Sequence, residues 1–128
     1  MNVKKKIQSL RVALAVIGFL FIFGLYPLMH YWPSSWAWIP SQAEYEQMIL
    51  GIYATLGVFL LIASKNPIEH LSLLWFTAWS SLVHSGIMFI QALVDPGEHP
   101  NLYGDVPALF IIAILLFILT PRKKELHE

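Results

Sequence analysis

Residues 71–94 constrain the fold of this chain more than any other stretch. They read LSLLWFTAWSSLVHSGIMFIQALV and contain no Asp, Glu, Lys or Arg. A helix of about 20 apolar residues spans the hydrocarbon core of a bilayer, so this stretch predicts a transmembrane helix. It is also the only long apolar stretch in the sequence with a regular row of polar side chains.

The polar row follows a seven-residue repeat. His70, Thr77, His84 and Gln91 recur every seven residues, and Ser81, Met88 and Asp95 fall on the intervening positions. Seven residues make nearly two turns of an α-helix, so these side chains share one face. Because polar groups are costly in lipid, we expect this face to turn towards other helices or a wet cavity.

The composition favours a membrane protein. Of the 128 residues, 57% are hydrophobic and only 12% are charged, about half the charged share of a soluble domain. The formal net charge of zero gives no general attraction to nucleic acid. The absence of cysteine excludes disulfides, thiol catalysis and thiolate metal sites. The gaps between apolar stretches leave no room for a soluble domain, so one membrane-embedded unit is predicted.

Four apolar stretches have the length of transmembrane helices. We expect helices over residues of about 12–31, 42–63, 67–94 and 103–120. The first follows a basic start but is too long for a signal-peptide core, so a retained helix is predicted. The expected fold is all-α: an antiparallel bundle of four transmembrane helices in one unit, residues 1–128.

The connection between the first two helices contains prolines and tryptophans. Pro33 and Pro40 oppose a continuous helix, and tryptophans are typical of the headgroup level of a membrane. We therefore expect a loop over residues 30–41 that lies in the interface. Ser41 and Glu44 have the spacing of a capping box at the start of the second helix.

The later connections also carry local signals. Asn66 is the expected cap of the third helix and Asp105 that of the fourth. Residues 95–101 are expected to form a loop. Two pairs of small residues are four apart, Gly51 with Thr55 and Gly104 with Ala108, and they are expected to allow close helix packing. The fourth helix has no polar side chain between its ends, which predicts a wall facing lipid or another subunit.

The charge pattern predicts the orientation. All eight Lys and Arg residues lie at the N-terminus, at the C-terminus or, as Lys65, between the second and third helices. The positive-inside rule then places both termini and Lys65 in the cytoplasm. The other two connections are expected to face outside, which agrees with four spans.

The candidate ligand-binding residues are Tyr53, Thr77, Ser81, His84 and Gln91. His84 is ionisable at membrane depth, which marks a functional site by default. Tyr53 lies at a similar depth, so a hydrogen bond between Tyr53 and His84 is expected. These residues predict a polar pocket among helices one to three, open to the outside. The alternative is that they only join helices by hydrogen bonds.

A second candidate is an outer-face polar cluster of His30, Glu46, Asp95 and Asp105. Acidic residues near helix starts favour helix capping and solubility. Carboxylates and imidazoles also ligate divalent metals. The spacings match no metal-binding motif, so no particular metal is predicted.

Haem is a further alternative. His70 and His84 lie about 21 Å apart along one helix face, and imidazole is a standard axial ligand of haem. No second helix carries matching histidines, which leaves a single haem, or a quinone, at His84. Nothing in the sequence resembles a catalytic triad, a phosphate-binding glycine loop or a zinc protease motif, so the sequence leans away from an enzyme.

Residues 48–93 carry a family resemblance. Its features are the block ILGIYATLGVFLL, the turn Asn66-Pro67, and the block FTAWSS followed by His84, Met88 and Gln91. Tyr26-Pro27-Leu28 precedes them. The pattern resembles a family of small four-helix bacterial membrane proteins known as a domain of unknown function. The resemblance covers most of the chain and implies a four-helix protein of the bacterial inner membrane. It brings no activity.

The sequence thus favours a small non-enzymatic protein of the bacterial inner membrane. Its outward-facing polar pocket on the third helix would bind a small or lipid-like molecule, or the protein would be an accessory subunit of a membrane complex. One alternative is a redox protein that handles haem or quinone through His84. Another is a purely structural module whose polar row forms a homo-oligomer interface. The lipid bilayer is the expected surrounding in each case, and nucleic acid is not an expected partner.

Overall fold

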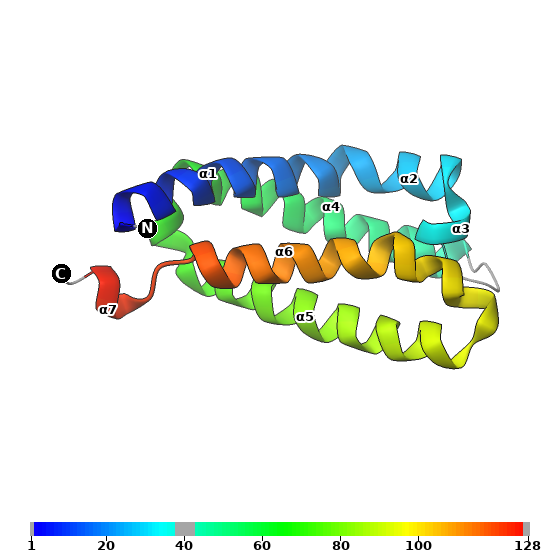
Figure 1. The fold of residues 1–128 in the computed structure, drawn as a ribbon. Coiled ribbons are helices and arrows are strands. Elements are labelled where there is room, and N and C mark those ends of the chain that lie inside the picture. Colours follow the sequence, from blue (N-terminus) through cyan, green and yellow to red (C-terminus); the bar gives the residue numbers. More distant parts are fainter. Residues whose placement is uncertain (1, 38–42, 127–128) are drawn as a thin grey trace.

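The computed structural model describes residues 2–37 and 43–126, which are helical and contain no strand. Figure 1 shows their order. The elements are α1 (Val3–Phe19), the π-helical turn η1 (Leu20–Gly24), α2 (Leu25–Tyr31), α3 (Pro33–Trp36), α4 (Ala43–Lys65), the 3-10 helix η2 (Pro67–His70), α5 (Leu71–Val94), the 3-10 helix η3 (Pro96–Tyr103), α6 (Asp105–Leu119) and α7 (Lys123–Leu126).

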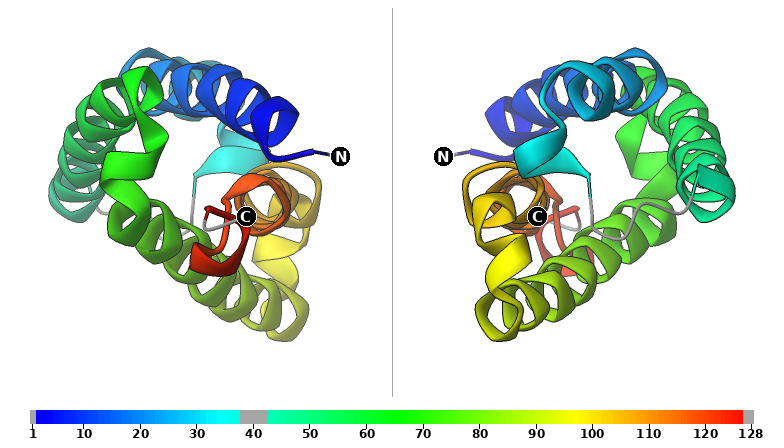
Figure 2. Two further views of the ribbon diagram at one scale, coloured as in Figure 1. Left: turned by 90° about the vertical axis from the view of Figure 1, so that its left-hand side faces the viewer. Right: turned by 90° about the vertical axis from the view of Figure 1, so that its right-hand side faces the viewer.

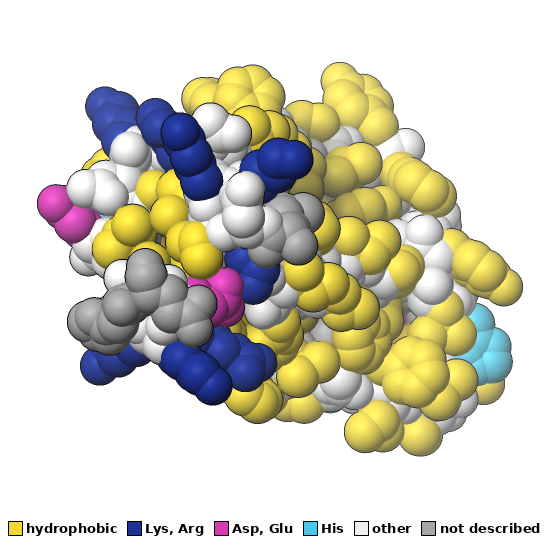
Figure 3. Space-filling model, turned by 60° about the vertical axis from the view of Figure 1, so that its left-hand side comes forward, with side chains coloured by type: hydrophobic (Ala, Val, Ile, Leu, Met, Phe, Trp, Pro, Cys, Tyr) yellow, Lys and Arg dark blue, Asp and Glu magenta, His cyan; other side chains and the backbone are white. Residues whose placement is uncertain are grey.

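Four rods make up the bundle: α1 continued by η1 and α2, then α4, then η2 with α5, and α6. By length and composition all four are able to cross a membrane. They alternate in direction, and both chain termini lie at the same end (Figure 1). Figure 3 shows Lys and Arg side chains gathered at that end and hydrophobic side chains over much of the rest of the face. The predicted all-α architecture with four spans is confirmed.

The rods pack mainly as two pairs. α1 lies against α4, and α5 lies against α6, while α1 also contacts α6. α4 and α5 meet near their connection and then run apart, as the end views show (Figure 2). In the bundle, α1 and α6 are therefore in contact, whereas α4 and α5 are separated along most of their length.

The half of the bundle nearest the termini is closely packed. Its centre holds five leucines with no exposed surface: Leu10, Leu14, Leu60, Leu74 and Leu116. They come from all four rods. Between membrane helices the attraction is mainly van der Waals contact, because lipid tails are as apolar as leucine. This contact closes the interior at that end.

The backbones of α1 and α4 touch at two glycines. A Cβ atom on Gly18 would lie 2.8 Å from the carbonyl oxygen of Gly57, and one on Gly57 would lie 2.7 Å from that of Gly18. Close packing was also expected at Gly104, where a Cβ atom would meet the Ser35 backbone, and at Gly51, where the prediction is wrong. Gly51 is exposed, and a Cβ atom there would meet nothing within 4 Å.

The first helix begins well before its expected start. The side chain of Asn2 accepts a hydrogen bond from the Lys5 backbone N–H at 2.8 Å and caps the helix at Val3. Lysines are good helix formers, so the basic segment continues the apolar one. Lys6 Nζ also forms a salt bridge of 2.9 Å with Glu125 Oε2, which ties the two ends of the chain together.

Neither expected side-chain cap forms. Asn66 precedes η2 but makes no capping bond with its side chain; its backbone carbonyl accepts from the Glu69 N–H at 3.2 Å instead. Asp105 is the first residue of α6 rather than its cap, which is Gly104. The expected capping box at Ser41 lies outside the described residues.

The connection between α5 and α6 is helical, whereas a loop was expected over residues 95–101. Asp95 accepts a hydrogen bond from the Gly97 N–H at 3.0 Å and starts η3. Pro96 and Pro100 fix φ at values that suit helical turns. The short helix α3 packs on η3, and a side chain at Gly104 would overlap the Ser35 backbone. α3 is thereby held at the end of the bundle opposite the termini (Figure 1).

α6 is the most enclosed of the four rods, not a peripheral wall. Half of its most apolar segment is buried, against 17–33% for the other three. Its apolar side chains can pack on every side, and α5 and α1 occupy two of these sides. The absence of polar residues therefore reflects burial within the protein as well as contact with lipid.

Gly57→Ala is expected to destabilise the bundle by about 1–3 kcal/mol, because the added methyl group must push α1 away from α4. The measurement is unfolding in detergent micelles. Gly51→Ala is the matched control on the same helix and is expected to stay within about 1 kcal/mol of the unmodified protein. Equal destabilisation by both changes would contradict the close contact.

Candidate functional site

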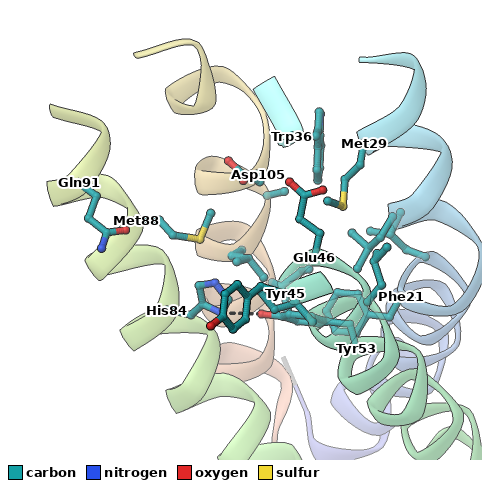
Figure 4. A pocket seen from close by; sticks show the side chains of 17 residues that line it. Phe21, Met29, Trp36, Tyr45, Glu46, Tyr53, His84, Met88, Gln91 and Asp105 are labelled. Carbon is teal, nitrogen blue, oxygen red and sulfur yellow. Dashed lines mark hydrogen bonds between the residues drawn. The ribbon is translucent and has the colours of Figure 1, made fainter. Parts of the chain in front are cut away.

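A cavity of about 360 Å³ lies between the helices, in the half of the bundle away from the termini (Figure 4). All four rods and α3 contribute to its wall. The lining residues are Leu20, Phe21, Leu25, Met29, Trp36, Tyr45, Glu46, Ile49, Leu50, Tyr53, His84, Met88, Gln91, Asp105, Ala108, Leu109 and Ile112. The wall is mainly apolar and aromatic, with a few polar groups.

Tyr53 and His84 form a hydrogen bond at the inner end of the cavity. The Tyr53 hydroxyl lies 2.7 Å from His84 Nδ1, so the expected contact between these residues is present (Figure 4). When the hydroxyl donates to Nδ1, the second ring nitrogen, Nε2, carries a proton and is a donor; in the other tautomer Nε2 is an acceptor. The bond also crosses between α4 and α5, which run apart at this level.

The π-helical turn η1 supports Tyr53. The Phe21 ring meets the Tyr53 ring edge to face, with centroids 5.0 Å apart. Pro27 in α2 has no N–H to offer the carbonyl of Phe23 and crowds the preceding turn. The helix widens just before it, where the Leu25 N–H bonds the carbonyl of Leu20. The widened turn places Leu20 and Phe21 in the cavity wall.

Two carboxylates line the other end of the cavity. Glu46 lies in the first turn of α4, and Asp105 begins α6. Figure 4 shows both side chains on the side of the cavity where Trp36 lies, away from the Tyr53–His84 hydrogen bond. Trp36 Nε1 is buried and has no hydrogen-bond partner in the part of the chain that the structure describes. The polar groups of the wall thus form two separate sets.

The five candidate ligand-binding residues divide into two groups. Tyr53, His84 and Gln91 line the cavity. Thr77 and Ser81 are buried but do not line it, and the Thr77 hydroxyl donates to the Leu73 carbonyl of its own helix at 2.8 Å. The row drifts around the helix by about 20° per seven residues. Consequently its members do not all reach this cavity: His84 and Gln91 do, and Thr77 and Ser81 do not.

The expected outer-face cluster is also divided. Glu46 and Asp105 belong to the cavity. His30 is exposed and stacks on Tyr26, with ring centroids 5.8 Å apart. Asp95 is exposed and caps η3. Within residues 2–37 and 43–126, no three His, Asp or Glu side chains are placed to hold a metal ion.

Several wall residues were not expected from the sequence. The predicted pocket lay among helices one to three, whereas α6 also supplies Asp105, Leu109 and Ile112. Met29 and Trp36 line it from α2 and α3. Apolar residues at membrane depth carry no local signal that separates a cavity wall from a lipid-facing surface. Only the packing of the rods reveals them.

Comparison with known proteins identifies the family. Neither a curated protein nor a solved structure matches the chain. A family of unknown function (DUF6632) matches residues 5–125. This match covers nearly the whole chain, and the protein therefore belongs to that family of unknown function.

Proposed function

We propose that the protein binds a small, largely apolar or lipid-like molecule in its interhelical cavity, without catalysing a reaction. The observation that carries this proposal is the Tyr53–His84 hydrogen bond in the wall of a 360 Å³ cavity. A polar pair that only joined helices would be packed on all sides. This pair instead faces open space between otherwise apolar helices, where a ligand can contact it.

The size and lining of the cavity support a small ligand. Ligand pockets in proteins have volumes of about 300–1,000 Å³, mainly apolar walls and a few placed polar groups. This cavity lies at the small end of that range. The fully buried leucines close the interior towards the termini. The ligand should therefore have a compact apolar body and a group that can hydrogen-bond to the second ring nitrogen of His84, Nε2.

The cavity opens sideways between α4 and α5. Tyr45 and Ile49 line it although their exposed fractions are 60% and 47%. Gln91, opposite them on α5, is likewise exposed and lines it. In a bilayer this opening meets lipid and headgroups rather than bulk water. A molecule dissolved in the membrane can enter by this route.

We further propose that the cavity lies in the outer half of a bacterial inner membrane. The Lys and Arg residues lie at the chain termini and at Lys65, which are at the opposite end of the bundle from the cavity. The positive-inside rule places that end in the cytoplasm.

We expect the unmodified protein to retain a bound molecule when it is extracted gently from membranes. The variant His84→Leu is expected to lose this molecule. Tyr53→Phe removes one hydrogen bond and is expected to weaken retention roughly 2- to 10-fold. Native mass spectrometry measures the bound mass. His70→Leu and Tyr26→Phe are the matched controls, because neither residue lines the cavity. A bound mass that persists in His84→Leu would contradict the assigned role of His84.

The orientation has a direct test, because the chain has no cysteine. A single cysteine at His99, in η3, is expected to react with a membrane-impermeant maleimide added to intact cells. A single cysteine at Lys65 is expected to react only after the membrane is permeabilised. Both positions are exposed in the structure. The reverse pattern would place the cavity in the cytoplasmic half.

A further inference from the structure

A groove between α1 and α4 lies at the end of the bundle where Lys and Arg side chains gather. Its volume is about 440 Å³, and it is lined by Gln8, Arg11, Val12, Ala15, Ser64 and Lys65. We infer that this basic groove binds an anionic phospholipid, with the headgroup phosphate at Arg11 and Lys65 and an acyl chain along α1. The inference is independent of the proposed function, because none of the six residues lines the cavity.

The α1 side of the basic groove has the same layers as a lipid. Gln8, Arg11, Val12 and Ala15 follow one another at steps of three, one and three residues, so they share one helix face. The first two are polar and the next two are apolar. Because a helix rises about 1.5 Å per residue, both layers lie within about 10 Å of helix. Val12 is 65% exposed and offers apolar surface to an acyl chain.

Arg11 is held in place by α4. Its Nε donates a hydrogen bond to the Ser64 carbonyl oxygen at 3.1 Å, which uses one of the five N–H groups of the guanidinium. Within residues 2–37 and 43–126, Arg11 makes no other hydrogen bond. The remaining four N–H groups are on the two Nη atoms, and their planar arrangement matches two oxygens of a phosphate group.

The positive charge of the groove is not neutralised by the described part of the chain. The salt bridge found there joins Lys6 to Glu125 and involves neither Arg11 nor Lys65. No described Asp or Glu lines the groove. Two like charges that line one groove repel each other, and an anion between them replaces this repulsion with attraction.

A simpler role for the two cations has to be weighed. Positive side chains near the C-terminus of a helix offset its partial negative charge, which amounts to about half an elementary charge. Lys65 lies in the last turn of α4, and Arg11 bonds to the Ser64 carbonyl at the same end. Two full positive charges exceed that partial charge. The helix end therefore accounts for the position of the cations but leaves net positive charge for an anion.

The surroundings of the groove favour a lipid over a soluble anion. Both helices that form it are long and apolar enough to cross a membrane, so the groove lies where such helices leave the bilayer. A soluble phosphate would leave Val12 and Ala15 uncovered, whereas an acyl chain covers them. Basic pockets between transmembrane helices are a known setting for anionic headgroups.

The test compares two lipids with the same acyl chains. Dioleoyl phosphatidylglycerol and dioleoyl phosphatidylcholine both contain a phosphate, but only the first has a net negative charge. Each is added to delipidated full-length protein in uncharged maltoside micelles, and native mass spectrometry measures the bound fraction. Phosphatidylglycerol is expected to bind at least about 10-fold more tightly than phosphatidylcholine.

Matched variants assign this preference to the basic groove. Arg11→Gln is expected to weaken phosphatidylglycerol binding about 10-fold and Lys65→Gln about 5-fold, with phosphatidylcholine binding unchanged. Lys4→Gln and Lys5→Gln remove the same charge from exposed positions at the same end of the bundle, outside the groove, and are expected to have no effect. Unfolding in the same micelles shows whether each variant is folded, and Lys65→Gln tests the site even if Arg11→Gln is not.

Three results would overturn the lipid site. Equal binding of the two lipids would remove the preference for an anion. Equal loss of phosphatidylglycerol binding in Lys4→Gln and Lys65→Gln would make the attraction a general property of the basic end. The third probe is glycerol 3-phosphate, a headgroup without acyl chains. If it displaces phosphatidylglycerol at equal concentration, the groove holds a soluble anion and not a lipid.

Discussion

The direct backbone contact between Gly18 and Gly57 sets the geometry on which the cavity depends. Lipid offers no hydrophobic force between helices, so contact at close range has to hold α1 to α4. One turn beyond Gly18, Phe21 reaches Tyr53, which lies one turn before Gly57. The Tyr53 hydroxyl is thereby aimed across the bundle at His84. Two residues without side chains thus position the polar pair of the site.

The two ends of the bundle differ in their packing. Near the termini, fully buried leucines from all four rods meet at the centre. Towards the other end, α4 and α5 separate, and α3 with η3 is placed over the end of the rods. The contact of Gly104 with the Ser35 backbone holds α3 there and brings Trp36 into the wall. The cavity therefore follows from the divergence of two helices within an otherwise close-packed bundle.

The sequence was informative where a property depends on the length of one helix or on the depth of a residue along it. The number of spans followed from apolar length, and the Tyr53–His84 contact followed from counting residues along two neighbouring helices. Properties that depend on packing between distant segments were missed. Gly18 and Gly57 are no different from Gly51 in their local sequence, yet only the first pair lies at a helix contact.

The same limit applies to the polar row of α5. A seven-residue repeat predicts a common face, but it does not say which neighbour covers each level of that face. Thr77 lies at the close-packed level and bonds to its own helix. His84 lies where α4 and α5 have separated, and it bonds across the cavity. Ser81 is buried between these levels.

The difference between Thr77 and His84 bears on function. A hydroxyl that bonds to the preceding turn of its own helix satisfies itself and needs no partner. An imidazole has two nitrogens, and the bond to Tyr53 uses one of them. The other nitrogen belongs to the same side chain, which lines the cavity. Glu46 and Asp105 line the cavity on the side where Trp36 lies. The polar groups of the wall therefore lie at its two ends, with apolar and aromatic side chains between them.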